Sequence, residues 1–131
     1  MKIDNPYISP IEIIIQAVDG TTNLVVNTTG IAYFTVPLKM NGMKLDSVHA
    51  RVITAGASGS ANLFNFKING TDMLSTALMI NAAGTSSVGS ATPYIIDTNH
   101  NTLATNDLIA VTVVQLNTTV PKGLIVRLNF I

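Results

Sequence analysis

Short apolar segments alternate with turn residues along the whole chain. Most of these segments contain β-branched and aromatic residues, which favour extended structure. In the segment from Leu45 to Ile53 the alternation is regular, and it places Val48, Ala50 and Val52 on the face expected to be buried. The pattern predicts strands over Ile11–Val18, Leu24–Val26 continuing in Ile31–Val36, Leu45–Ile53, Leu63–Ile68, Ala77–Ile80, Tyr94–Asp97, Leu108–Leu116 and Leu124–Ile131.

Turn signals recur between these segments at intervals of roughly 8 to 12 residues, a spacing typical of sandwiches and barrels. The predicted turns are Asp19-Gly20, Asn27–Gly30, Asn41-Gly42 and Asn69-Gly70. A single helical turn is expected at Asp72–Leu74, and nowhere does an apolar period near 3.6 persist over about ten residues. We therefore expect an all-β fold, a single antiparallel, jelly-roll-like β-sandwich of about eight strands.

The length of 131 residues fits one domain with one core. Residues 1–10 contain Pro6 and Pro10, which disfavour a helix or a central strand. The expected organisation is an extended N-terminal arm over residues 1–10 and a β-sandwich domain over residues 11–131. The first residues do not have the pattern of a secretory signal, and no apolar run is as long as a membrane helix requires.

The amino-acid composition indicates what kind of surface covers this fold. Only 11% of the residues are charged, against roughly 25% in an average soluble domain, whereas 47% are apolar. A coat of Thr, Asn, Ser and Gly with little charge suggests a surface that lies against other subunits. The net charge is zero and the basic residues are scattered, so neither nucleic acid nor an anionic membrane is an expected partner.

The most site-like string is Asp97-Thr98-Asn99-His100-Asn101, which begins like a calcium loop. The loop requires Gly at its sixth position and Glu at its twelfth, where this chain has Thr102 and Leu108. An Asx turn, in which Asp97 and Asn99 bond their own backbone, is the favoured alternative to calcium.

Other chemistry has even less support in the sequence. His49 and His100 are the only histidines, and their spacing matches no metal motif. There is no cysteine, no GxSxG elbow and only one glutamate, Glu12. Five methionines are expected to fill gaps in the core. We therefore expect no enzyme activity, no catalytic residues, no metal ligands and no cofactor.

Four stretches of the chain together resemble a β-sandwich domain of small virion proteins and of fibre or tail-associated proteins of tailed bacteriophages. They are NGMKLDSVHARVITAGASGS, NGTDMLST, ATPYIIDTNHNTLATNDLIAVTV and KGLIVRLNFI, within Ile31 to Ile131. The matching points are Gly42-Met43, Thr54–Gly56, Asp72–Ser75, Pro93–Asp97, Asn106-Asp107 and Gly123-Leu124. These points are turns and strands, so they imply a shared fold more than a shared activity.

The resemblance implies a non-enzymatic virion structural protein, most simply an auxiliary capsid protein of the head-decoration or head-fibre type. We expect a homo-oligomer, with a trimer as one form, bound to the major capsid protein or other virion proteins after assembly in the bacterial cytoplasm. The alternative is a receptor- or glycan-binding tip of a fibre or tail, which would use loops Gly56–Ser60 and Ala82–Ala91 to contact a host surface glycan.

Overall fold

The computed structural model describes residues 10–131, and these form ten strands and one short 3-10 helix. The predicted arm over residues 1–10 lies outside the described residues, apart from Pro10. In chain order the elements are β1 (Ile11–Asn23), β2 (Asn27–Thr35), η1 (Leu38–Met40), β3 (Leu45–Arg51), β4 (Asn62–Ile68), β5 (Thr71–Asp72), β6 (Leu74–Thr76), β7 (Leu78–Ile80), β8 (Ile95–Ile96), β9 (Leu108–Gln115) and β10 (Lys122–Phe130).

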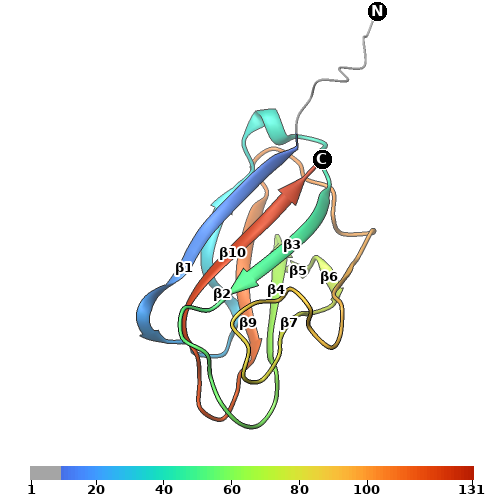
Figure 1. The fold of residues 1–131 in the computed structure, drawn as a ribbon. Helices are drawn as coiled ribbons and strands as arrows, with labels where there is room; N and C mark the ends of the chain where they lie inside the picture. The colour runs from blue at the N-terminus through green and yellow to red at the C-terminus, as the bar shows by residue number, and fades with distance from the viewer. Residues whose placement is uncertain (1–9) are drawn as a thin grey trace, which may run out of the picture.

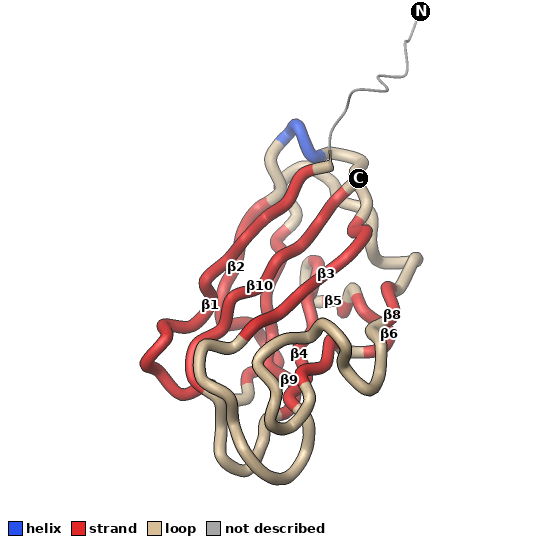
Figure 2. The backbone as a smooth tube through the Cα atoms, in the orientation of Figure 1, coloured by secondary structure: helices blue, strands red, loops and turns tan. Residues whose placement is uncertain are grey.

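The strands form two main antiparallel sheets that face each other (Figures 1 and 2). One sheet has the order β1-β10-β3, and the other has the order β2-β9-β4-β5, with β7 also pairing with β4. A separate small sheet pairs β6 with β8. The predicted all-β sandwich is confirmed.

The inward faces of both sheets form the core. The predicted buried face of β3 is confirmed, because Val48, Ala50 and Val52 are all buried. The central strands β4, β9 and β10 contribute many of the buried side chains, at Phe64, Phe66, Ile109, Val111, Val113, Leu124, Val126, Leu128 and Phe130. Each such side chain stabilises the fold by about 1.5–3 kcal/mol through removal from water. The expected core role of methionine is confirmed at Met40, Met43 and Met73.

The number of strands is ten, and the expectation of about eight was too low. The difference lies mainly after the hairpin at Asn69-Gly70, where both residues have positive φ (48° and 86°) and the turn joins β4 to β5, as predicted. The helical turn expected at Asp72–Leu74 is wrong. This segment is extended because the Met73 N–H donates to the Phe66 carbonyl at 2.7 Å.

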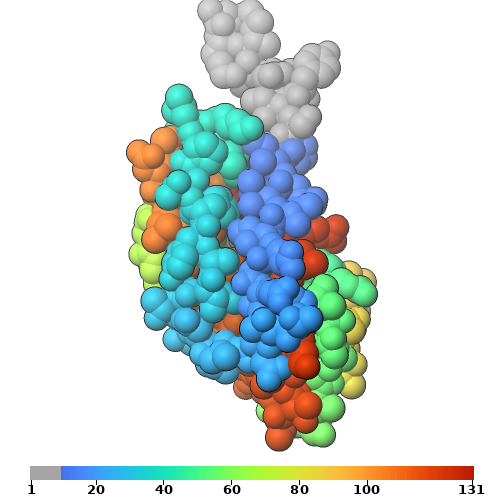
Figure 3. Space-filling model, turned by 90° about the vertical axis from the view of Figure 1, so that its left-hand side faces the viewer, coloured from blue at the N-terminus to red at the C-terminus, as the bar shows by residue number. Residues whose placement is uncertain are grey.

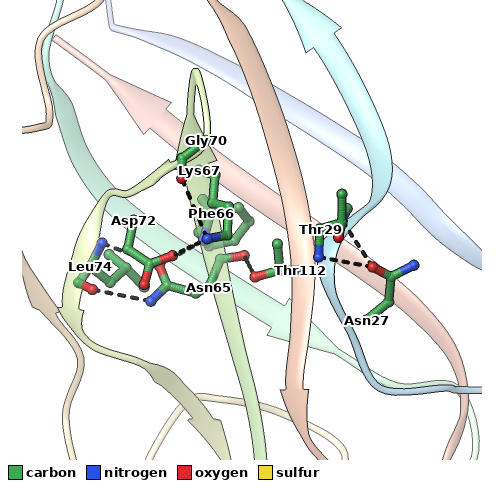
Figure 4. A network of polar contacts seen from close by, with 10 residues as sticks. Asn27, Thr29, Asn65, Phe66, Lys67, Gly70, Asp72, Leu74 and Thr112 are labelled. Atoms are coloured by element: carbon green, nitrogen blue, oxygen red, sulfur yellow. Dashed lines mark hydrogen bonds and ion pairs between the residues drawn. The ribbon is translucent and has the colours of Figure 1, made fainter.

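A buried asparagine holds the chain at this point (Figure 4). The Asn65 Oδ1 atom accepts a hydrogen bond from the Leu74 N–H at 3.2 Å, and Asn65 Nδ2 donates to the Leu74 carbonyl at 3.1 Å. The Thr112 hydroxyl donates to the Asn65 carbonyl at 3.0 Å. Asn65 thereby takes the place of a ladder partner for Leu74, and β6 leaves the sheet to pair with β8.

Strand β1 does not end at the predicted Asp19-Gly20 turn but continues to Asn23. Its register against β10 shifts after Gln16 and again after Val18, so the strand bulges where a turn was expected. The bulge requires a glycine at position 123. Gly123 on β10 has a φ of +73°, and a Cβ there would lie 2.9 Å from the Gly20 Cα. A side chain at position 123 would overlap its neighbours, whereas a Cβ on Gly20 would lie 3.5 Å from Ile53, an ordinary contact distance.

The prediction of a strand over Leu24–Val26 with a turn at Asn27–Gly30 is also wrong, because β2 begins at Asn27. Asn27 Oδ1 accepts hydrogen bonds from the N–H groups of Thr29 (2.9 Å) and Gly30 (3.0 Å). This Asx motif sits inside the strand and shifts its register before Ala32. Leu24–Val26 is the link between β1 and β2.

Candidate interaction surface

The calcium-like string forms a turn in the structure. Asp97 Oδ1 accepts a hydrogen bond from the Asn99 N–H at 3.0 Å, and Asp97 Oδ2 lies 2.8 Å from His100 Nδ1. The hydrogen bond from His100, followed by that from Asn99, holds the pKa of Asp97 below its ordinary value. The Asn101 side chain is buried and donates to the Leu45 carbonyl at 3.2 Å. This arrangement is the Asx turn favoured above.

The other candidate residues are dispersed. Glu12 lies on β1, His49 on β3 and His100 in the turn after β8. Within residues 10–131 no three His, Asp or Glu side chains gather in a way that could hold a metal ion. No helix in this part of the chain is long and apolar enough to cross a membrane.

The two loops proposed for glycan contact pair with different neighbours. In the loop Gly56–Ser60, Ala57 exchanges backbone hydrogen bonds of 3.0 Å with Thr119 at the end of the sandwich. In the loop Ala82–Ala91, Thr85 and Ser87 bond the backbone of β3, so this loop extends the edge of the β1-β10-β3 sheet.

The strands β1 and β2 lie next to one another on the side of the sandwich that faces the viewer in Figure 3. Among the described residues, β1 hydrogen-bonds only with β10 and β2 only with β9. The opposite edge of each strand is therefore unpaired, over 13 residues in β1 and 9 in β2. Neither strand contains Lys or Pro, the residues that usually protect an exposed edge. We call this region the β1–β2 side.

Apolar groups on the β1–β2 side are only partly covered. Ile11, Ile13 and Ile15 pack against the core but remain half-buried. In the link between the strands, Val25 is 70% exposed and Val26 is 51% exposed. Such residues are normally buried on assembly when they cluster in one region.

A groove of about 350 Å³ lies at one end of this side. Its lining comes from the end of β1, the link and the start of β2, with Ala17, Val18, Asp19, Thr22, Asn23, Val25, Asn27 and Ile31. The polar groups at its rim are bonded within the rim, since the Thr21 hydroxyl donates to Asp19 Oδ2 at 2.7 Å. That bond is the main reason why the pKa of Asp19 is lowered. The groove therefore offers apolar contact to a partner.

Charge is sparse on this side, where Glu12 and Asp19 are the only ionisable residues between Ile11 and Thr35 that carry a formal charge at pH 7.

Comparison of the chain with protein-family models, with curated proteins and with solved structures found no match.

The importance of Val25 and Val26 was missed from the sequence, where Leu24–Val26 was interpreted as a strand. One signal was available, because Leu24–Val26, flanked by Asn23 and Asn27, is an apolar stretch too short for a core strand. Their exposure depends on the bulge at Gly20 and on the Asx motif at Asn27, which the apolar pattern does not reveal.

Proposed function

We propose that this chain is a non-enzymatic structural protein that assembles through protein–protein contacts on its β1–β2 side. The observation that carries the proposal is the pair of long, unpaired strand edges flanked by half-buried isoleucines and nearly free of charge. A second copy can add a strand to such an edge through main-chain hydrogen bonds. Interfaces between permanent subunits are apolar in the same way.

The proposal extends to a virion of a tailed bacteriophage, where the chain would be an auxiliary capsid protein of the head-decoration or head-fibre type. The motifs between Ile31 and Ile131 support this assignment through their resemblance to a phage β-sandwich domain, and the observed sandwich agrees with the fold which that resemblance implies. Repeated copies on a lattice would hold firmly even with modest affinity per contact.

Sedimentation of the purified chain over a range of concentrations tests the assembly. We expect an oligomer whose dissociation is promoted by Val25→Asp, because the substitution places a carboxylate in the apolar groove. Val88→Asp is the matched control, since Val88 is 75% exposed in a loop far along the chain from β1 and β2. A monomer at every concentration, or equal behaviour of both variants, would contradict the assembly on this side.

Cryo-electron microscopy of the native particle that contains the chain tests the location. Density for the domain on the capsid, with the β1–β2 side against a neighbour, is the expected result. Density at a fibre end or tail tip, with Gly56–Ser60 and Ala82–Ala91 facing outward, would favour the receptor-binding alternative.

A further inference from the structure

A second concave site lies on the outer face of the β1-β10-β3 sheet, the sheet that faces the viewer in Figure 1. It is a pocket of about 250 Å³ lined by His49, Arg51, Ile125 and Arg127. The strand register brings these residues together, because Arg127 on β10 pairs with His49 on β3, and Ile125 pairs with Arg51. Directly opposite residues on one face of a sheet have side chains in contact range.

The positive charge in this pocket is not neutralised within the described chain. Neither Arg51 nor Arg127 has an ion pair within residues 10–131, where the pairs are Lys67–Asp72 and Asp97–His100. Glu12 pairs with Asn129 one row from Arg127 on the same face, and β3 carries the exposed Asp46, but neither forms an ion pair with these arginines. Two guanidinium groups and an imidazole therefore surround an apolar floor at Ile125.

The lowered pKa of His49 agrees with an excess of positive charge in the pocket. Burial, followed by the charges of Arg127 and Arg51, lowers the pKa of His49 from its ordinary value. Its Nε2 atom lies 3.1 Å from the Ser86 hydroxyl in the loop that borders β3. Residues 81–91 of that loop carry no ionisable side chain, so an anion is the group that would compensate the site.

We propose that this pocket binds the carboxylate of an acidic saccharide. Guanidinium groups match a carboxylate through paired hydrogen bonds, and the hydroxyl and amide side chains of Ser86 and Gln16 around the pocket suit sugar hydroxyls. The volume lies just below that of pockets for drug-sized ligands, which fits one sugar unit. This inference goes beyond the assembly proposed above and does not depend on it.

A saccharide fits the pocket better than an acidic peptide does. The pocket lies on β10, the central strand, whose main-chain groups are already paired with β1 and β3. An extended peptide obtains much of its affinity from main-chain bonds at a free sheet edge. At this pocket only side chains can form hydrogen bonds with a ligand. Such contacts suit a small ligand better than an extended peptide.

Proton NMR of the two histidine rings tests the proposal, because His49 lines the pocket and His100 lies in a separate turn as an internal reference. Titration with oligogalacturonate should shift the His49 signals, raise the pKa of His49 and leave His100 unchanged. Loss of both guanidiniums in Arg51→Gln/Arg127→Gln should weaken binding by about ten-fold or more. Both arginines are exposed, so the variant should fold.

Lys39→Gln is the matched control, since it removes an exposed cation from η1 and should bind like the unaltered chain. The parallel probes are maltotriose, inorganic phosphate and a glutamate-rich peptide. Shifts with oligogalacturonate alone would support the proposal. No binding, equal binding of the neutral sugar, equal or tighter binding of phosphate or of the peptide, or full binding by the double variant would each overturn it.

Discussion

The strands β10 and β1 lie side by side in one sheet, yet they are buried to different degrees. The inward side chains of β10, among them Leu128, are completely buried, whereas those of β1, such as Ile13, are only half-buried. Leu128 and Ile13 are direct cross-strand partners. The centre of the sandwich is thus completed by its own strands, whereas the β1–β2 side retains apolar area that residues 10–131 leave partly exposed.

The largest expected effect comes from substituting these two partners separately. Leu128→Ala should lower the free energy of unfolding by about 2–5 kcal/mol, because it leaves a cavity in the core. Ile13→Ala should cost only about 1–2 kcal/mol in the monomer, since that side chain is already partly exposed to water. Urea denaturation of dilute protein measures both values. Equal losses would show that β1 is as firmly packed as β10.

The stability losses of the two variants should respond differently to protein concentration. If the β1–β2 side is the interface, the loss for Ile13→Ala should grow with protein concentration, because association stabilises the folded state by mass action. The loss for Leu128→Ala should change much less, since that side chain is buried in the monomer already. A concentration-independent loss at Ile13 would place the interface elsewhere.

The next effect concerns the bulge that bends the end of β1 away from the regular register. Gly123→Ala should cost about 2–4 kcal/mol, because it combines a left-handed backbone with overlap against Gly20 and Ile53. Gly70→Ala is the matched comparison, with a φ of +86° but open space around it, and should cost about 1–2 kcal/mol. Thermal unfolding compares them, and a similar loss in both would mean that the bulge tolerates a side chain.

A smaller difference in the free energy of unfolding is expected between two asparagines that accept hydrogen bonds from backbone N–H groups (Figure 4). Asn65 is buried, so Asn65→Ala leaves the Leu74 N–H and carbonyl without partners, at a cost of about 1–3 kcal/mol. Asn27 is exposed, and water can replace its bonds to Thr29 and Gly30. Asn27→Ala should therefore cost about 0.5–1 kcal/mol. Urea midpoints would contradict this order if Asn27 mattered more.

The sequence predicted those parts of the fold that local pattern determines. Alternation was sufficient for the buried face of β3, and Asn69-Gly70 was sufficient for its hairpin, because each depends on neighbouring residues only. The ends of β1 and β2 were missed because they depend on the approach of Gly20 to Gly123 and on the bonds of Asn27. The pocket around Arg127 could not be predicted either, since it requires the β3–β10 register, which links residues 78 positions apart.

The smallest expected effect is a pH dependence of stability that arises from His49. Its pKa is lower in the folded chain than the ordinary value of 6.5, chiefly through burial and then through Arg127 and Arg51. The unfolded chain therefore binds the proton more readily, and stability should be complete above the ordinary pKa and decrease as the pH falls below it. The acidic groups on the strands of this sheet are Glu12 and Asp19 on β1 and Asp46 on β3, and Glu12 lies one row away from the His49–Arg127 pair.

His49→Gln should flatten the pH dependence between about pH 5 and 7, because the variant has no ring to protonate beside the two arginines. His100 remains in both proteins, so its contribution cancels in the comparison of urea midpoints. A slope unchanged by the substitution would show that solvent and counterions already compensate the charge on this face. A flattened slope would instead show that burial and the charges of Arg127 and Arg51 oppose protonation of His49 in the folded chain.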